Sequence, residues 1–403
     1  MTRMNSRTLR LLVATLTVAV LGPACGGGKK AAAPPPPSET TTAPVPTGPD
    51  TVAAQLRSTI GGMLEEHVVL SAAATSASLG GRNDEFSAAS SALEANSEAL
   101  TTTIGTVFGS QAATAFGPLW KRHNQLLIGY AQGQPQAAND LLAYPKDFGA
   151  FINSQLPDLP ADAVADLARQ HLASERAVID AQRANDQAKA YTNLRSAMAQ
   201  AVTIAEPLAA ATTAKFPEKV NGNPKSPAST LRLTLNTALR EHVYFLAATT
   251  GATLAGRQDE SKAAAAALDA NSDALAADIA SIYGADAGKA FDPLWRRHIG
   301  FFMDYTNGVG ARDKAKQDKA VQELLAYTVT FGAFINSATP ALSAESVGDQ
   351  VKTHVLTVKD TIDAQGARNY PAAYNAVRTA AEHMAKMSES LSGAIVKQFQ
   401  QKF

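Results

Sequence analysis

The chain has 403 residues, and its 36 lysines and arginines are balanced by 36 aspartates and glutamates. A nucleic-acid-binding protein needs an excess of basic residues to neutralise phosphates, so the zero net charge argues against that function. The single cysteine excludes an intramolecular disulfide framework and any cysteine-rich zinc or iron–sulfur site. Aromatic residues make up 6% of the chain and alanine is abundant, which favours helices over sheets.

Residues 1–24 have the pattern of a secretory signal peptide. Arginines precede a short apolar run, Leu11–Leu21, and Gly22-Pro23 ends it. The run is shorter than the roughly 20 apolar residues that a transmembrane helix needs. We therefore predict that this segment directs the chain out of the cytoplasm.

The only cysteine follows this segment directly, in Ala24-Cys25-Gly26. The arrangement resembles a bacterial lipobox, in which the cysteine becomes the lipidated first residue of the mature protein. The resemblance implies an extracytoplasmic protein held at the bacterial cell membrane by lipid on Cys25. The alternative is ordinary signal cleavage that leaves a free thiol.

Residues 25–50 are rich in proline, threonine, glycine and alanine. Such a composition cannot bury a core, and its prolines favour an extended chain of about 3.1 Å per residue. We predict a disordered tether here, with folded structure from Thr51 onward.

The rest of the chain contains two similar sequences. Gly61–Tyr130 and Asn236–Tyr305, which are 175 residues apart, share 33 identities in 70 aligned positions. We call residues 51–217 copy one and residues 227–403 copy two. The Gly-, Asn- and Pro-containing segment Glu218–Ser226 separates them as a predicted linker.

Further along, the offset between the copies rises from 175 to 183, because Phe148–Ser154 recurs as Phe331–Ser337. Copy two therefore carries eight additional residues. We place them around Ala311–Lys319, where alternating basic and acidic residues predict a solvated loop.

Apolar residues in both copies recur at helical spacing, as in Phe116, Trp120, His123 and Leu127. No stretch alternates with the period of a strand. The predicted fold class is all-α, with two tandem antiparallel bundles that are similar to four-helix bundles. The helices expected in copy one span residues 51–80, 85–107, 111–132, 138–154, 161–186 and 188–216.

The seven histidines are the main candidates for a functional site. His383 aligns with Gln200, and the other six form equivalent pairs between the copies. Each lies well inside a different predicted helix of its copy, on the apolar face. In an antiparallel bundle such positions share one level, so the imidazoles are expected to converge. The pairs are His67 with His242, His123 with His298, and His171 with His354.

Three hypotheses account for such a set. The imidazoles can be buried polar groups that organise the core through hydrogen bonds. They can bind a transition metal such as copper, zinc or iron. They can also serve acid–base catalysis, although no nucleophile motif or phosphate-binding loop accompanies them. The predicted metal ligands are His242, His298, His354, His383 and Met387 in copy two, and, as a weaker site, His67, His123 and His171 in copy one.

Met387 enters this set because it lies four residues after His383, on the same helix face, and its thioether suits copper. Copy one has Gln200 and Ile204 at the two positions, which makes its predicted site the weaker one.

Acidic residues near the histidines are predicted to orient the imidazoles rather than bind the metal. Glu66, Glu241 and Glu382 each directly precede a histidine, and adjacent helical residues point about 100° apart. The Glu-x-x-His pattern of di-iron carboxylate bundles is not repeated at these histidines, which disfavours a ferritin-like oxidase. Asp180 and Asp363, both in Ile-Asp-Ala-Gln, are predicted to act in the same supporting way.

Several segments of copy two resemble a family of uncharacterised helical-bundle proteins of Gram-positive bacteria, here in a tandem, actinobacterial-type lipoprotein form. The segments are Leu239–Val243, Leu294–Ile299, Phe331–Pro340, His354–Thr357 and Ser390–Phe399. The resemblance implies the helical fold and brings no established activity. The residues that it emphasises are Glu241, His242, Asn271, His298, His354 and His383.

The function predicted from the sequence is that of a cell-surface lipoprotein, a non-catalytic binding protein whose histidine-lined core holds a transition metal. The alternative is a structural or interaction module of the cell envelope, with histidines that serve packing and an unidentified envelope protein as partner. An enzyme is the weakest of the three.

Overall fold

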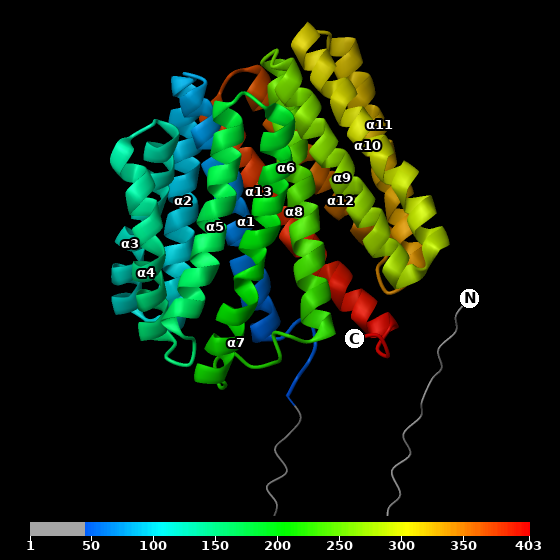
Figure 1. The fold of residues 1–403 in the computed structure, drawn as a ribbon. Helices are drawn as coiled ribbons and strands as arrows, with labels where there is room; N and C mark the ends of the chain where they lie inside the picture. The colour runs from blue at the N-terminus through cyan, green and yellow to red at the C-terminus, as the bar shows by residue number, and fades with distance from the viewer. Residues whose placement is uncertain (1–44) are drawn as a thin grey trace, which may run out of the picture. The chain divides into compact units, whose positions relative to one another are not determined.

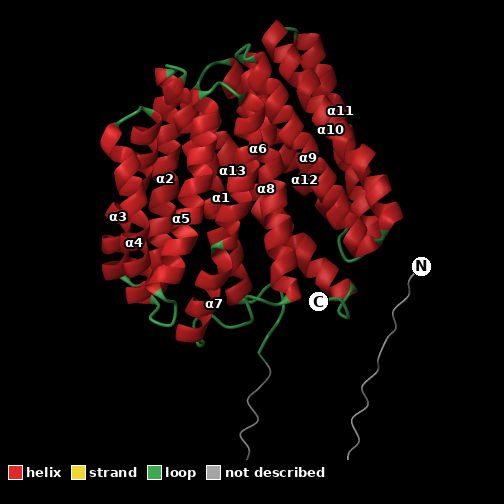
Figure 2. Ribbon diagram, in the orientation of Figure 1, coloured by secondary structure: helices red, strands yellow, loops and turns green. Residues whose placement is uncertain are grey.

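The computed structural model describes residues 45–403 and places them in one compact unit. Within this range the regular elements are helices, without a strand, which confirms the predicted all-α fold class (Figures 1 and 2). None of the helices found there is both long and apolar enough to cross a membrane. The predicted signal peptide, Cys25 and the tether up to residue 44 lie outside the described residues.

Copy one begins at a capped helix, since the Thr51 hydroxyl accepts a hydrogen bond from the Ala54 N–H at 3.3 Å. Its helices are α1 (Val52–Leu79), α2 (Asn83–Phe108), α3 (Ser110–Ala131), α4 (Pro135–Gln155), α5 (Ala161–Arg183), α6 (Gln187–Thr203) and α7 (Ala205–Lys215).

Copy two begins in the same way, with Ser226 as the cap and Pro227 in the first turn. Its helices are α8 (Pro227–Leu254), α9 (Gln258–Tyr283), α10 (Ala285–Ala311), α11 (Lys314–Ala338), α12 (Ala344–Gly366) and α13 (Tyr370–Gln398).

The two copies have the same internal arrangement. Each helix packs against the next one along the chain, and the first helix of the copy also contacts the third, fifth and sixth. Helices α1 and α8 are therefore central to their copies. A side chain in the middle of α1 or α8 is surrounded by three or four other helices.

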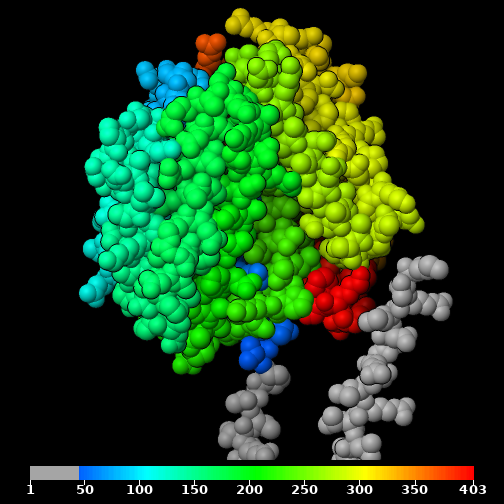
Figure 3. Space-filling model, viewed as in Figure 1, coloured from blue at the N-terminus to red at the C-terminus, as the bar shows by residue number. Residues whose placement is uncertain are grey.

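The copies pack against each other along their central helices. Helix α1 contacts α8, α6 contacts α9, and α13 contacts α2. The last two contacts are equivalent under exchange of the copies. A single hydrophobic core contains buried side chains of both, and Figure 3 shows the green surface of copy one meeting the yellow-green surface of copy two.

Ion pairs across this interface follow the same exchange. The Arg378 Nε lies 2.8 Å from a Glu66 carboxylate oxygen, and the Arg195 Nε lies 2.9 Å from that of Glu241. Glu66 and Glu241 are equivalent positions, as are Arg195 and Arg378. The two ion pairs are therefore equivalent, because each copy supplies the arginine of one pair and the glutamate of the other.

The structure corrects three sequence predictions. Residues 188–216 are not one helix, because Pro207 lacks an N–H and its ring clashes with the carbonyl four residues earlier; α6 ends at Thr203. Copy two has Ser390 at that position, and α13 is continuous.

The eight additional residues of copy two are helical, not a loop. Helix α10 has 27 residues against 22 in α3, and α11 has 25 against 21 in α4. The α10–α11 hairpin, yellow in Figure 1, is thus about one turn longer on each side than its counterpart in copy one.

Ordered contacts begin before Thr51, where the sequence predicts the end of the tether. The carbonyls of Pro46, Thr47 and Pro49 accept hydrogen bonds from Asn223 N, the Ser226 hydroxyl and Arg232 Nη1 at 2.8–2.9 Å. The last residues of the predicted tether are therefore fixed against the segment that joins the two copies.

Candidate metal centre

All seven histidines lie in helices, as predicted, and six of them form two buried clusters. The cluster of copy one combines His67 of α1, His123 of α3 and His171 of α5 with Glu175, also of α5. One ligand atom of each residue lies within 4.8 Å of those of the others. The four residues are buried, with exposed fractions of 0–5%.

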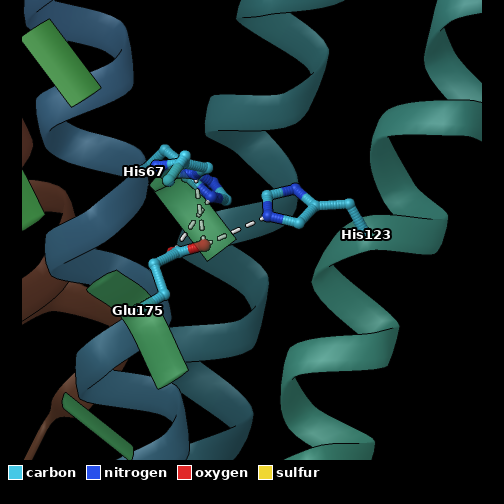
Figure 4. Close-up of side chains that lie close together, drawn as sticks. His67, His123 and Glu175 are labelled. Carbon is cyan, nitrogen blue, oxygen red and sulfur yellow. Dashed lines mark hydrogen bonds and ion pairs between the residues drawn. The ribbon is translucent and has the colours of Figure 1, made fainter. Parts of the chain in front are cut away.

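Glu175 is the centre of the copy-one cluster. Its carboxylate oxygens lie 3.1 Å from His171 Nε2, 3.2 Å from His123 Nε2 and 3.4 Å from His67 Nε2. Figure 4 shows Glu175 with His67 and His123. His171 and Glu175 are four residues apart on α5 and therefore share a helix face. Glu175 is not among the site residues predicted from the sequence, and its signal there is the spacing His-x-x-x-Glu from His171.

Burial and proximity set the charges of this cluster. Burial lowers the pKa of His171 to about 4 and lowers that of His123, so these imidazoles are neutral at pH 7. Burial alone would raise the pKa of Glu175, but the facing imidazoles of His171 and His67 hold it well below its ordinary value. Glu175 is thus a carboxylate, and His123 and His171 are neutral imidazoles, which are the protonation states that bind metals.

Aromatic side chains fix the ring positions. Trp120 lies 4.9 Å from both His67 and His123 between ring centroids, and Tyr144 stacks on His123 at 5.3 Å. A cavity of about 70 Å³ with largely apolar walls adjoins His123 and His171. The rings are therefore held by packing on one side and face a small space on the other.

The cluster of copy two contains His242 of α8, His298 of α10 and His354 of α12. The Nε2 atoms of His242 and His298 are 3.2 Å apart. Burial lowers the pKa of His298 to about 3 and holds those of the other two well below the ordinary value. The position equivalent to Glu175 is Val358, so this cluster has no carboxylate.

The tautomer of His298 follows from its backbone contact. Its Nδ1 lies within hydrogen-bond reach of the Trp295 carbonyl, which can only accept a hydrogen bond. The Nδ1 therefore carries the proton, and Nε2 has the free lone pair that faces His242.

The structure does not bring the predicted fourth imidazole of copy two, that of His383, into this cluster. His383 is half-buried on α13 and its Nε2 lies 2.7 Å from the Gln350 carbonyl, outside the three-histidine cluster. The buried face of α13 passes through Met384 and Met387, and residue 383 is rotated about 100° from Met384. The copper site built on His383 with Met387 therefore loses its basis, and copy one, not copy two, has the larger donor set.

Of the five carboxylates predicted to orient the imidazoles, four bond to other groups and one is exposed. Glu66 and Glu241 accept hydrogen bonds from Asn96 and Asn271 and pair with arginines of the other copy. Glu382 is exposed. Asp180 accepts a hydrogen bond from the Tyr130 hydroxyl. Asp363 accepts one from the Tyr305 hydroxyl and forms an ion pair with Lys359.

Comparison of the chain with models of protein families, with curated proteins and with solved structures found no match. The resemblance to a Gram-positive helical family therefore stays a prediction.

Proposed function

We propose that this chain is a lipid-anchored protein of the bacterial cell surface that binds one divalent transition metal ion in copy one without catalysing a reaction. The convergence of three imidazoles and one carboxylate within 4.8 Å carries the proposal. Such a donor set suits zinc first, and also iron or copper. The anchor and the location rest on the signal-peptide and lipobox patterns that end at Cys25.

The contacts in the cluster favour a cation over a hydrogen-bonded core. Of the three short contacts to Glu175, that of His123 alone has hydrogen-bond geometry. The Nε2 atoms of His67 and His171 and one oxygen of Glu175 are buried without a hydrogen-bond partner in the protein. Buried polar atoms usually have such a partner. A cation would bond all four donors at once and would neutralise the carboxylate.

The geometry favours storage, transport or sensing of the ion over catalysis. Four protein donors complete a tetrahedral shell, whereas catalytic zinc sites keep one position open for water or substrate. The donors are almost completely buried, and the adjoining cavity of about 70 Å³ admits only a small molecule.

Metal analysis of the protein purified without a histidine tag tests the proposal. We expect about one equivalent of bound metal per chain, or its uptake on titration with zinc, copper or iron. At a free metal concentration 100 times Kd, binding should stabilise the fold by about 2.7 kcal/mol, which a thermal melt detects.

Variants of the carboxylate separate this proposal from a packing role. Glu175→Gln should weaken metal binding by more than the 10- to 100-fold that changes outside the ligand shell typically cause. Glu382→Gln removes an exposed carboxylate and should bind as the wild type. Val358→Glu gives copy two the donor set of copy one and should add a second equivalent.

Absence of metal after purification, together with an unchanged melting temperature in all three titrations, would contradict the proposal. The histidines would then serve packing, and the protein would be a structural or interaction module of the cell envelope.

A further inference from the structure

A cavity of about 610 Å³ lies between the two copies, away from both histidine clusters. Helices α1 and α8 contribute Leu70 and Phe245 to its wall, and α6 and α13 contribute Tyr191 and Tyr374. Its lining includes the C-terminal parts of α1 and α8, so it is at the opposite end of these helices from Val45. The volume is in the range of about 300–1,000 Å³ that is typical of small-molecule sites.

Two arginines and two glutamates of the lining satisfy one another. Arg82 pairs with Glu85 at 2.8 Å, and the equivalent Arg257 pairs with Glu260 at 2.6 Å. Arg257 also lies 3.5 Å from Glu85, which links the two pairs across the copies. This polar network is neutral and leaves no charge for a ligand.

Arg312 and Arg368 are the other charged residues of the lining, and both are exposed. Among residues 45–403, the guanidinium group of neither arginine has an ion-pair partner or a hydrogen-bond acceptor. The lining therefore has an excess of positive charge at its exposed edge, beside apolar and aromatic walls.

The backbone at these two arginines is unusual. Both have φ of 55°, in the left-handed region that disfavours side chains with a Cβ. In copy one the corresponding turns contain Gly133, with φ of 73°, and Asn185, with φ of 55°, which are residues that adopt this conformation more readily. Copy two thus places arginine at two strained positions, and both positions line the cavity. Strain of this kind concentrates at functional sites.

We propose that this cavity binds an amphipathic organic anion, with the apolar body between the copies and the anionic head on Arg312 and Arg368. A carboxylate and a phosphate head share the required chemistry, since the arginine guanidinium can donate two parallel hydrogen bonds to either. The walls supply leucine, valine and tyrosine surfaces for an alkyl or aromatic body.

Isothermal titration of the full chain with decanoate, decyl phosphate and uncharged 1-decanol tests the proposal. We expect saturable binding of one anion per chain, and at least tenfold weaker binding of 1-decanol. The tighter of the two anions identifies the head group. Ala248→Trp, which fills the cavity from its wall, should abolish binding of both.

The decisive variant is Arg312→Gly/Arg368→Asn, which introduces the residues found in the corresponding turns of copy one. Its melting temperature should equal or exceed that of the wild type, because the strained arginines are gone, while affinity for the anion falls at least tenfold. Asn185→Gly alters the equivalent turn of copy one, outside the lining, and should bind normally. Failure of the wild type to bind either anion, equal binding of 1-decanol, or unchanged affinity in the double variant would overturn the proposal.

Discussion

At the scale of single residues, burial of the imidazoles makes stability depend on pH. His298 has a pKa of about 3 in the fold and about 6.5 when unfolded, and His171 has about 4 in the fold. Between these values the unfolded chain binds more protons than the folded one. The stabilising effect of a neutral buried histidine is therefore complete above pH 6.5 and is lost as the pH falls towards 3 or 4.

We predict that the free energy of unfolding of the metal-free protein falls below pH 6.5, with up to about 1.4 kcal/mol per pH unit from each such histidine. Urea unfolding between pH 4 and 8 measures this dependence. His298→Phe should reduce the slope of the unfolding free energy against pH by the contribution of one histidine. Subtracting the variant's curve from that of the wild type removes the effects of the other titrating residues. Parallel curves for the two proteins would contradict the assignment.

The sequence shows which helices the histidines occupy but not which neighbours they meet. Helical spacing and the equivalent positions in the two copies predict that all seven histidines lie inside helices, and six of them meet in the two clusters. Glu175 lies a full helical turn after His171, whereas the predicted supporting acids Glu66, Glu241 and Glu382 lie directly beside a histidine. The sequence does not show that His383 lies outside the cluster, because a rotation of about 100° about the α13 axis separates the core from its edge.

At the scale of elements, glycine and proline made the helix ends predictable. The break after Thr203 required Pro207 to be weighed against the continuous apolar pattern of residues 188–216. The longer α10–α11 hairpin was not predictable from its charged residues, because a polar stretch is equally compatible with a loop and with an exposed helix.

Ser226 caps α8 and also bonds the segment before α1, so we expect its removal to destabilise the fold more than the loss of an exposed cap. Its buried hydroxyl accepts the Ser229 N–H at 3.1 Å and donates to the Thr47 carbonyl at 2.8 Å. We predict that Ser226→Ala lowers the free energy of unfolding by about 1–2 kcal/mol. Ser343→Ala, at the exposed cap of α12, should cost less, and urea unfolding of the two variants measures the difference. Equal costs would show that the contact with Thr47 contributes nothing.

At the scale of the whole molecule, the interface between the copies contains an asymmetric ion pair formed by two equivalent positions. Glu65 of α1 and Arg240 of α8 are equivalent in sequence, and both are buried, with Glu65 Oε2 3.6 Å from Arg240 Nε. Two identical copies would place like charges at these positions. The arrangement was not predictable from the sequence, because nothing local indicates which faces of the two bundles meet.

A double-mutant cycle on this pair tests the interface. Arg240→Met leaves Glu65 buried without its partner and should cost about 3–5 kcal/mol, whereas Glu65→Leu/Arg240→Met should be close to neutral or stabilising. Thermal or urea unfolding of the full chain measures both. A single-variant cost near zero would mean that the charges are not coupled across the copies.

The covalent link between the copies has a consequence for how each can vary. In a homodimer of separate chains, every substitution appears on both sides of the symmetry axis, so a change that improves one site alters its twin as well. In this chain a substitution appears once. One half can therefore have Glu175 while the other has Val358, and one half can keep Gly133 and Asn185 while the other has Arg312 and Arg368. Two halves of one architecture are free to take on separate tasks.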